Sequence, residues 1–161
     1  MNTFSGWIES VEKVVGMILI AAMTLVIAAA VVFRYFFHSP LFWANEASIY
    51  MMAWITFIGG SLGLKYKSQA SITFLVDRFS IKGKRILAIA SYGIILIFMA
   101  ILLYLSYEWV ILASDQKSTS MRIPMWIPYL SVPVGLTCAF IHLLNHFVEL
   151  FKGKLQGGEP I

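Results

Sequence analysis

The sequence predicts an all-α integral membrane protein with four transmembrane helices, and two observations carry that prediction. The first is composition: 60% of the 161 residues are hydrophobic and 12% are charged, whereas an ordinary soluble domain has about 45–50% apolar and 25% charged residues. The second is the placement of the charges, which leaves four apolar stretches of about the 20 residues that cross a bilayer as a helix. A soluble enzyme and a disordered chain are both excluded, because neither accommodates this much apolar sequence.

The four expected spans cover residues 14–33, 47–64, 86–107 and 123–148 of a single membrane domain, residues 1–161. We expect helices rather than barrel strands, because each stretch is continuously apolar and does not alternate. The small residues 28–30 of the first span resemble the cleavage site of a secretory signal peptide. Glu9 and Glu12 precede it, however, and its apolar run continues to Phe33, so we expect an uncleaved span.

The positive residues predict the orientation of the spans. Nine Lys and Arg residues fall in the two terminal segments and the second loop, and three fall in the first and third loops. Because positive residues are retained on the cytoplasmic side, we expect both termini in the cytoplasm and the protein in a bacterial inner membrane. The net charge of +4 is therefore a topology signal, and no nucleic-acid partner is expected.

The segment 70–80, between the second and third spans, has an amphipathic helical pattern. Its apolar stripe is followed by a basic run, which suits a helix lying in the cytoplasmic interface beside anionic head groups. Two interpretations of this segment remain open: it forms an elbow on the membrane surface, or it docks to a partner helix. The residues of the stripe are Ile72, Leu75, Val76 and Phe79.

The first outer loop and the start of the second span carry a dense group of polar and aromatic residues. Arg34 and Glu46 end neighbouring antiparallel spans on one side, so an ion pair at the membrane interface is expected, and the lower dielectric there strengthens it. Trp43 lies at the depth where amphipathic rings anchor in head groups. Helix positioning, contact with a periplasmic partner protein and a direct cargo site are the three interpretations of this group.

Within the second span, Gly59, Gly60 and Gly63 contain a small-xxx-small pair, which permits the backbone of another helix to approach closely. The sequence does not decide whether that helix belongs to this chain. In the fourth span, Pro124 and Pro128 occupy the first turns, where a missing N–H is harmless, and Pro133 lies deeper and is expected to kink the helix.

The sequence contains few groups suited to catalysis, transport or cofactor binding. The interiors of the spans contain no Asp, Glu, Lys or Arg, although a self-sufficient carrier needs polar groups at mid-membrane. His142 and His146 share one helix face, and His38 lies at the opposite end of the spans, so no trans-axial haem pair forms. We expect no catalytic residue, cofactor, metal or substrate site in this chain. Two rival classes remain, a membrane anchor of an oxidoreductase and an independent small carrier.

Several short motifs resemble the small membrane subunit, the DctQ type, of the tripartite ATP-independent periplasmic (TRAP) transporters. The order and spacing of these motifs, together with size and four-span topology, extend the resemblance over nearly the full chain. Ser71 stands where that family often has a histidine before a hydrophobic-Val-Asp segment. The motifs occupy residues 32–35 with Pro40, 43–46 with Tyr50, 54–59, 71–77, 123–126 and 132–135.

The resemblance implies an accessory subunit of a sodium-coupled importer of organic acids, such as a C4-dicarboxylate or a sialic acid. In that family a large elevator-type membrane subunit moves the cargo, a periplasmic binding protein delivers it, and the small subunit acts as a scaffold in the lipid bilayer. No cargo or sodium residue is transferred to this chain, because those sites belong to the large subunit. The polar ending of the sequence leads us to expect the large subunit on a separate polypeptide.

Overall fold

The computed structural model describes residues 2–67 and 81–151, and in these ranges four helices are long and apolar enough to cross a membrane. This confirms the predicted all-α class with four apolar helices. The interfacial helix expected at residues 70–80 lies outside the described residues. The elements are α1 (Asn2–Tyr35), α2 (Phe42–Lys67), α4 (Ile81–Leu112), α5 (Trp126–Tyr129) and α6 (Ser131–Phe151).

Helices α1, α2 and α4 extend beyond the expected apolar spans at both ends, and the fourth span is interrupted. Helix α1 begins at Asn2, well before residue 14, because polar side chains in its first turns find partners on α2 and α6. In the fourth span, Pro124 lies ahead of the helix and forms an isolated antiparallel β-bridge with Lys117 in the preceding loop. Helices α5 and α6 are separated at Leu130. Pro133, which lacks an N–H, cannot hydrogen-bond to the carbonyl four residues earlier, and the interruption falls in that turn.

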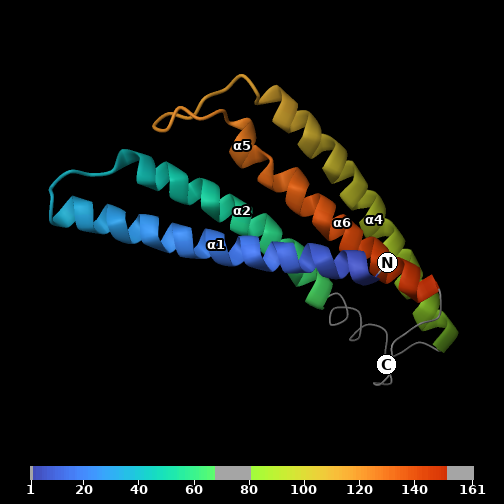
Figure 1. Ribbon diagram of the computed structural model, residues 1–161. Helices are drawn as coiled ribbons and strands as arrows, with labels where there is room; N and C mark the ends of the chain where they lie inside the picture. The colour runs from blue at the N-terminus through green and yellow to red at the C-terminus, as the bar shows by residue number, and fades with distance from the viewer. Residues whose placement is uncertain (1, 68–80, 152–161) are drawn as a thin grey trace.

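The four long helices form a row in the order α1, α2, α6, α4 and not a closed bundle (Figure 1). Helix α6 packs extensively against α2 and α4, and α1 packs mainly against α2. Among the described residues, neither α1 nor α2 packs extensively against α4. The described helices therefore leave the two broad faces of the row uncovered by one another.

The helices converge at one end of the row and spread toward the other (Figure 1). We call these the terminal end, where the first turns of α1 meet the last turns of α6, and the loop end, which carries the loops 36–41 and 113–125. Helices α2 and α6 both run from the loop end to the terminal end, so they are parallel. The small apolar core, which includes Tyr92, Met99, Ala139 and Leu143, lies between α4 and α6.

Of the glycines in the described helices, Gly135 makes the closest approach to another helix, between α6 and α2. A Cβ atom placed on Gly135 would lie 2.6 Å from the Cβ of Phe57 and 2.8 Å from its carbonyl carbon and oxygen. Only a residue without a side chain fits at this distance, so Gly135 sets the spacing of the two central helices.

Most large apolar side chains of α1 and α4 point away from the protein. Leu25 and Met17 on α1, and Ile94, Phe98 and Ile111 on α4, are all exposed in the isolated chain. In water such a surface would drive aggregation, whereas in a bilayer it is covered by lipid or by another membrane protein.

Candidate functional site

The polar residues of the row gather at its two ends, and the loop-end group is organised around Glu46. This residue lies in the second turn of α2, and its carboxylate accepts hydrogen bonds from three consecutive backbone N–H groups of the loop after α4. The distances are 3.1 Å to Thr119, 3.0 Å to Ser120 and 2.8 Å to Met121. The Tyr50 hydroxyl, one turn further along α2, donates to the same carboxylate at 2.8 Å.

The loop that Glu46 binds is itself folded back on its own backbone. The N–H of Ser118 donates to the carbonyl of Ile123 at 2.9 Å, and the N–H of Met125 donates to the carbonyl of Gln116 at 2.9 Å. Arg122 completes the turn with a φ of 52°, a left-handed conformation that is uncommon for a residue with a side chain. Glu46 therefore fixes an ordered loop onto α2, and that loop forms part of the surface at the loop end.

The other residues predicted at this end lie nearby but take no part in the Glu46 group. Arg34 is exposed in the last turn of α1, and Trp43 is exposed in the first turn of α2. None of the ion pairs found in residues 2–67 and 81–151 joins Arg34 to Glu46. The physical reason is that the Glu46 carboxylate is already bound by four donors, three of them backbone groups. Arg34 and Trp43 remain candidates for contact with a partner protein.

At the terminal end, a buried polar chain crosses from α1 to α6. The His142 imidazole, 1% exposed, lies between two α1 side chains, Ser5 at 6% and Glu12 at 4%. Its Nδ1 atom is 2.8 Å from the Ser5 hydroxyl oxygen, and its Nε2 atom is 3.0 Å from Oε2 of Glu12. Both ring nitrogens of His142 are thus occupied, which leaves neither free to ligate a haem or a metal.

Serine, histidine and glutamate also make up hydrolytic triads, but this chain of contacts lacks what hydrolysis requires. The Ser5 side chain is buried between α1 and α6, where a substrate carbonyl has no access. Within the described part of the chain, no three His, Cys, Asp or Glu side chains are grouped so that they hold a metal ion. The group therefore provides hydrogen bonds between two helices.

A second, more exposed network links α1 to α2 through Glu9, which lies between Ser5 and Glu12 in the sequence of α1. Lys65 on α2 donates to the Glu9 carboxylate at 2.6 Å and to the Ser5 carbonyl at 2.9 Å. Lys13 donates to the other Glu9 oxygen at 2.7 Å and lies over the Tyr66 ring, whose hydroxyl also donates to Glu9. The side chain of Lys65 is 18% exposed and that of Lys13 is 51% exposed, so Lys65 is the better shielded partner.

The three glycines predicted as packing residues lie on an open face of α2. A Cβ atom added at Gly59, Gly60 or Gly63 would meet nothing within 4 Å. Together with Met52 and Thr56 at helical spacing, they form what we call the glycine face. Because α1 and α6 pack on other sides of α2, the glycine face belongs to one broad side of the row.

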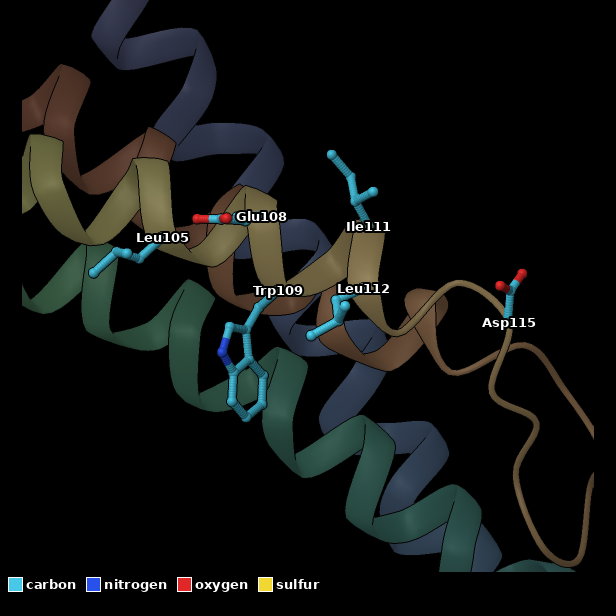
Figure 2. Close-up of a pocket in the computed structure, with 6 residues that line it drawn as sticks. All are labelled: Leu105, Glu108, Trp109, Ile111, Leu112 and Asp115. Carbon is cyan, nitrogen blue, oxygen red and sulfur yellow. The ribbon is translucent and has the colours of Figure 1, made fainter.

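A hollow near the loop end of α4 does not have the form of a ligand site. Figure 2 shows its six lining residues, which come from the last turns of α4 and the following loop. The side chains of Ile111 and Trp109 point to different sides of the helix and do not converge on one space. A ligand pocket needs polar groups directed at a shared interior, so we assign no ligand to this hollow.

The pairing of Glu12 with His142 was missed from the sequence, which placed Glu9 and Glu12 ahead of the first span and His142 near the inner end of the fourth. A signal exists on α1, because Ser5, Glu9 and Glu12 recur at the spacing of one helix face. That stripe indicates a buried polar contact, yet it does not identify a partner 130 residues away.

Comparison with known proteins finds one family and several relatives. The family model for the DctQ component of tripartite ATP-independent periplasmic transporters matches residues 23–153. The C4-dicarboxylate TRAP transporter small permease protein DctQ of Vibrio cholerae is 23% identical over 176 residues, covering 92% of this chain and 74% of the relative. The sialic acid TRAP transporter small permease protein SiaQ of the same organism is 22% identical over 146 residues, covering 90% and 84%.

A third relative differs in length. The isethionate TRAP transporter permease protein DctMQ of Oleidesulfovibrio alaskensis is 25% identical over 152 residues, which cover 87% of this chain and 24% of the relative. The family match contains Glu46, the glycine face and His142, whereas Ser5, Glu9 and Glu12 precede its first residue.

Proposed function

Because the chain belongs to the DctQ component family of the tripartite ATP-independent periplasmic transporters, we propose that it braces a larger, cargo-carrying membrane subunit of such a transporter. The family is one of non-enzymatic transporter subunits, which sets aside the oxidoreductase anchor. The chain is accordingly a multi-pass membrane protein of a bacterial TRAP transporter.

The observation that carries the scaffold proposal is the open row of helices. A carrier that works alone encloses its cargo between helices and places polar groups at mid-membrane. Here the described Asp, Glu, Lys and Arg residues of the long helices lie toward their ends, and the described helices leave two broad apolar faces open. A flat array of this kind can pack beside a larger membrane subunit and extend that subunit in the plane of the bilayer. One face of the array then contacts lipid and the other contacts protein.

The glycine face is our candidate for the contact with the large subunit. Its open backbone lets another helix approach closely. Because lipid tails are as apolar as the side chains, no hydrophobic driving force brings helices together in a bilayer, and close packing at small residues takes its place. The DctMQ relative supports a close association, since the segment matched by this chain makes up 24% of that protein.

The cargo we propose is a small organic acid taken up with sodium. The relatives are named for C4-dicarboxylate, sialic acid and isethionate, which are all anionic. We place the cargo and sodium sites in the large subunit and none in this chain.

The orientation we propose has both termini in the cytoplasm, supported by nine positive residues on that side against three on the other. The loop end then faces the periplasm. Arg34, Trp43 and the loop that Glu46 holds are available there for contact with the periplasmic binding protein. The segment 70–80 is proposed as a cytoplasmic interfacial helix.

A copurification experiment with matched glycine variants tests the scaffold role. Gly60→Leu and Gly63→Leu place a bulky side chain on the glycine face, and Gly93→Leu adds the same side chain at an equally open position on α4. We expect the first two variants to lose the large subunit on affinity purification from the native membrane and the third to retain it. Equal recovery with all three variants would remove the glycine face from the interface, and wild-type protein that purifies alone would overturn the scaffold role itself.

A further inference from the structure

The turn between α1 and α2 gathers aromatic side chains on its surface. Five of the nine residues 35–43 are aromatic, and residues 35–45 include no Asp, Glu, Lys or Arg. We call these five residues the aromatic turn, and each of them is 44–79% exposed in the isolated chain. They are Tyr35, Phe36, Phe37, Phe42 and Trp43. So much exposed apolar surface is unfavourable in water, which indicates that another medium covers it.

The backbone of the aromatic turn keeps its rings close to the helix ends. The N–H of Ser39 donates to the carbonyl of Phe33 at 3.2 Å, and His38 has a φ of 51°. This is the left-handed conformation that ends a helix and reverses the chain. Only the six residues 36–41 separate α1 from α2, so the aromatic residues lie within about one helical turn, roughly 5 Å, of a helix end.

That position corresponds to the head-group layer of a bilayer. The apolar run of α1 ends at Phe33, two residues before the aromatic turn begins, and the Phe37 ring lies 5.0 Å from the Phe33 ring between centroids. A bilayer has about 5–7 Å of polar head groups on each side of its hydrocarbon core. Arg34 lies at the same level, is exposed, and takes part in none of the ion pairs found in the described ranges. A lipid phosphate is a suitable partner for its guanidinium.

Lipid fits this surface better than a protein partner does. Aromatic rings with a polar edge, such as those of Tyr35 and Trp43, are favoured at the interface between membrane and water. Helix α1 is the end helix of the row (Figure 1), so the aromatic turn borders the apolar outer surface of α1. The glycines of the glycine face, our candidate contact with the large subunit, start at Gly59. That residue lies 16 positions after Trp43, or about 24 Å further along α2.

The loop after α4 has the opposite composition. Residues 113–125 contain no aromatic residue, and Asp115, Gln116, Lys117 and Arg122 are all exposed. A loop with these side chains is stable in water, whereas the aromatic turn is not. The two loops at the loop end are therefore suited to different media.

We propose that the aromatic turn, together with Arg34, is a phospholipid-binding edge. Its rings lie among the head groups of one leaflet, and Arg34 pairs with lipid phosphates. This lipid contact holds for either orientation of the row and does not require the scaffold role. A soluble binding protein then reaches the loop held by Glu46 without displacing lipid, whereas head groups cover Arg34 and Trp43. Of the contacts proposed above for that protein, the loop held by Glu46 is thus the first candidate.

Spin-label accessibility of the full chain in phospholipid nanodiscs measures where the turn lies. A nitroxide is attached at Phe36→Cys or Phe42→Cys in a Cys138→Ala background, which removes the one native thiol. Leu25→Cys on α1 and Gln116→Cys in the loop after α4 are matched references, because both side chains are exposed, as those of the aromatic turn are. Oxygen concentrates in lipid, whereas a nickel(II) chelate stays in water.

We expect the nickel chelate to reach the labels at positions 36 and 42 several-fold less than the label at position 116, and oxygen to reach them more. The label at position 25 should show the largest excess of oxygen over nickel. Nickel accessibility equal to that at position 116 would place the turn in water and overturn the proposal. A label at position 36 or 42 that neither reagent reaches would mean that a second copy of the chain covers the turn, which would also overturn it.

A second measurement tests whether the rings themselves hold the turn among the head groups. Phe36→Ser with Phe37→Ser removes two of the five rings, and Ile111→Ser with Leu112→Ser removes a similarly exposed apolar pair at the loop end of α4. With the label at position 42, we expect nickel accessibility to rise toward that of position 116 in the first pair and to stay unchanged in the second. No rise in the first pair would show that the rings do not set the depth, and the proposed anchoring would be wrong. If either pair fails to insert, the single-label measurements decide the matter.

Discussion

Replacing Gly135 with alanine should force α2 and α6 apart. The added Cβ atom would lie 2.6 Å from the Cβ and 2.8 Å from the carbonyl carbon and oxygen of Phe57, whereas carbon atoms in favourable contact lie about 3.5–4.0 Å apart. The atoms it meets belong to the backbone or are fixed to it, so no rotamer change of Phe57 relieves the clash. The two helices must therefore separate by roughly 1 Å.

The expected cost follows from that displacement. Adding one methyl group to a tight interface costs about 1–3 kcal/mol, and the better helix propensity of alanine returns up to about 1 kcal/mol. We expect a net loss of about 1–2 kcal/mol, which for a chain of this size lowers the unfolding temperature by roughly 2–8 °C.

Thermal unfolding of the purified chain in detergent, followed by size-exclusion chromatography, measures this change. Gly63→Ala and Gly93→Ala are the controls, because a Cβ atom at either position meets nothing within 4 Å. They should unfold at or slightly above the wild-type temperature. If Gly135→Ala unfolds together with the controls, the α2–α6 contact is not the tight one described, and Gly135 does not set the helix spacing.

The remaining predictions concern the polar groups at the two ends. Glu46→Gln replaces a charged acceptor by a neutral one, so the amides of residues 119–121 should exchange faster while those of α1 are unchanged; unaltered exchange in that loop would contradict the role given to Glu46. Lys65→Met should lower the unfolding temperature more than Lys13→Met, because Lys65 is shielded and also binds the Ser5 carbonyl. An equal effect of the two lysine variants would count against that ranking.

The helical class and the number of spans could be predicted from the sequence because both depend on local properties. A run of apolar residues must be helical in lipid wherever its neighbours lie. The family could be predicted for a similar reason, since the motifs around residues 43–46 and 132–135 are contiguous in the chain. Both predictions are confirmed.

The polar contacts could not be predicted because they join residues far apart. Glu46 was expected to pair with Arg34, which is close in sequence, and instead binds backbone groups 73–75 residues later. Backbone donors carry no sequence signature, so a loop that offers three of them cannot be recognised by composition. His142 presented the same difficulty, because nothing in its helix identifies Glu12 as its partner.

The order of the helices in the row has a consequence for biosynthesis. Helix α1 is made first, yet the partner of Ser5 and Glu12 is on α6, the helix made last, and Ser5 and His142 are 137 residues apart. At about 5–20 residues per second, roughly 7–27 seconds pass between the synthesis of the two contacting residues. During that interval Glu12 stands at the membrane surface without its imidazole, and the nascent chain needs Lys65 and Glu9 to hold α1 beside α2. The more exposed of the two networks is therefore the one that can form first, and the buried one closes the fold after the last span has been released.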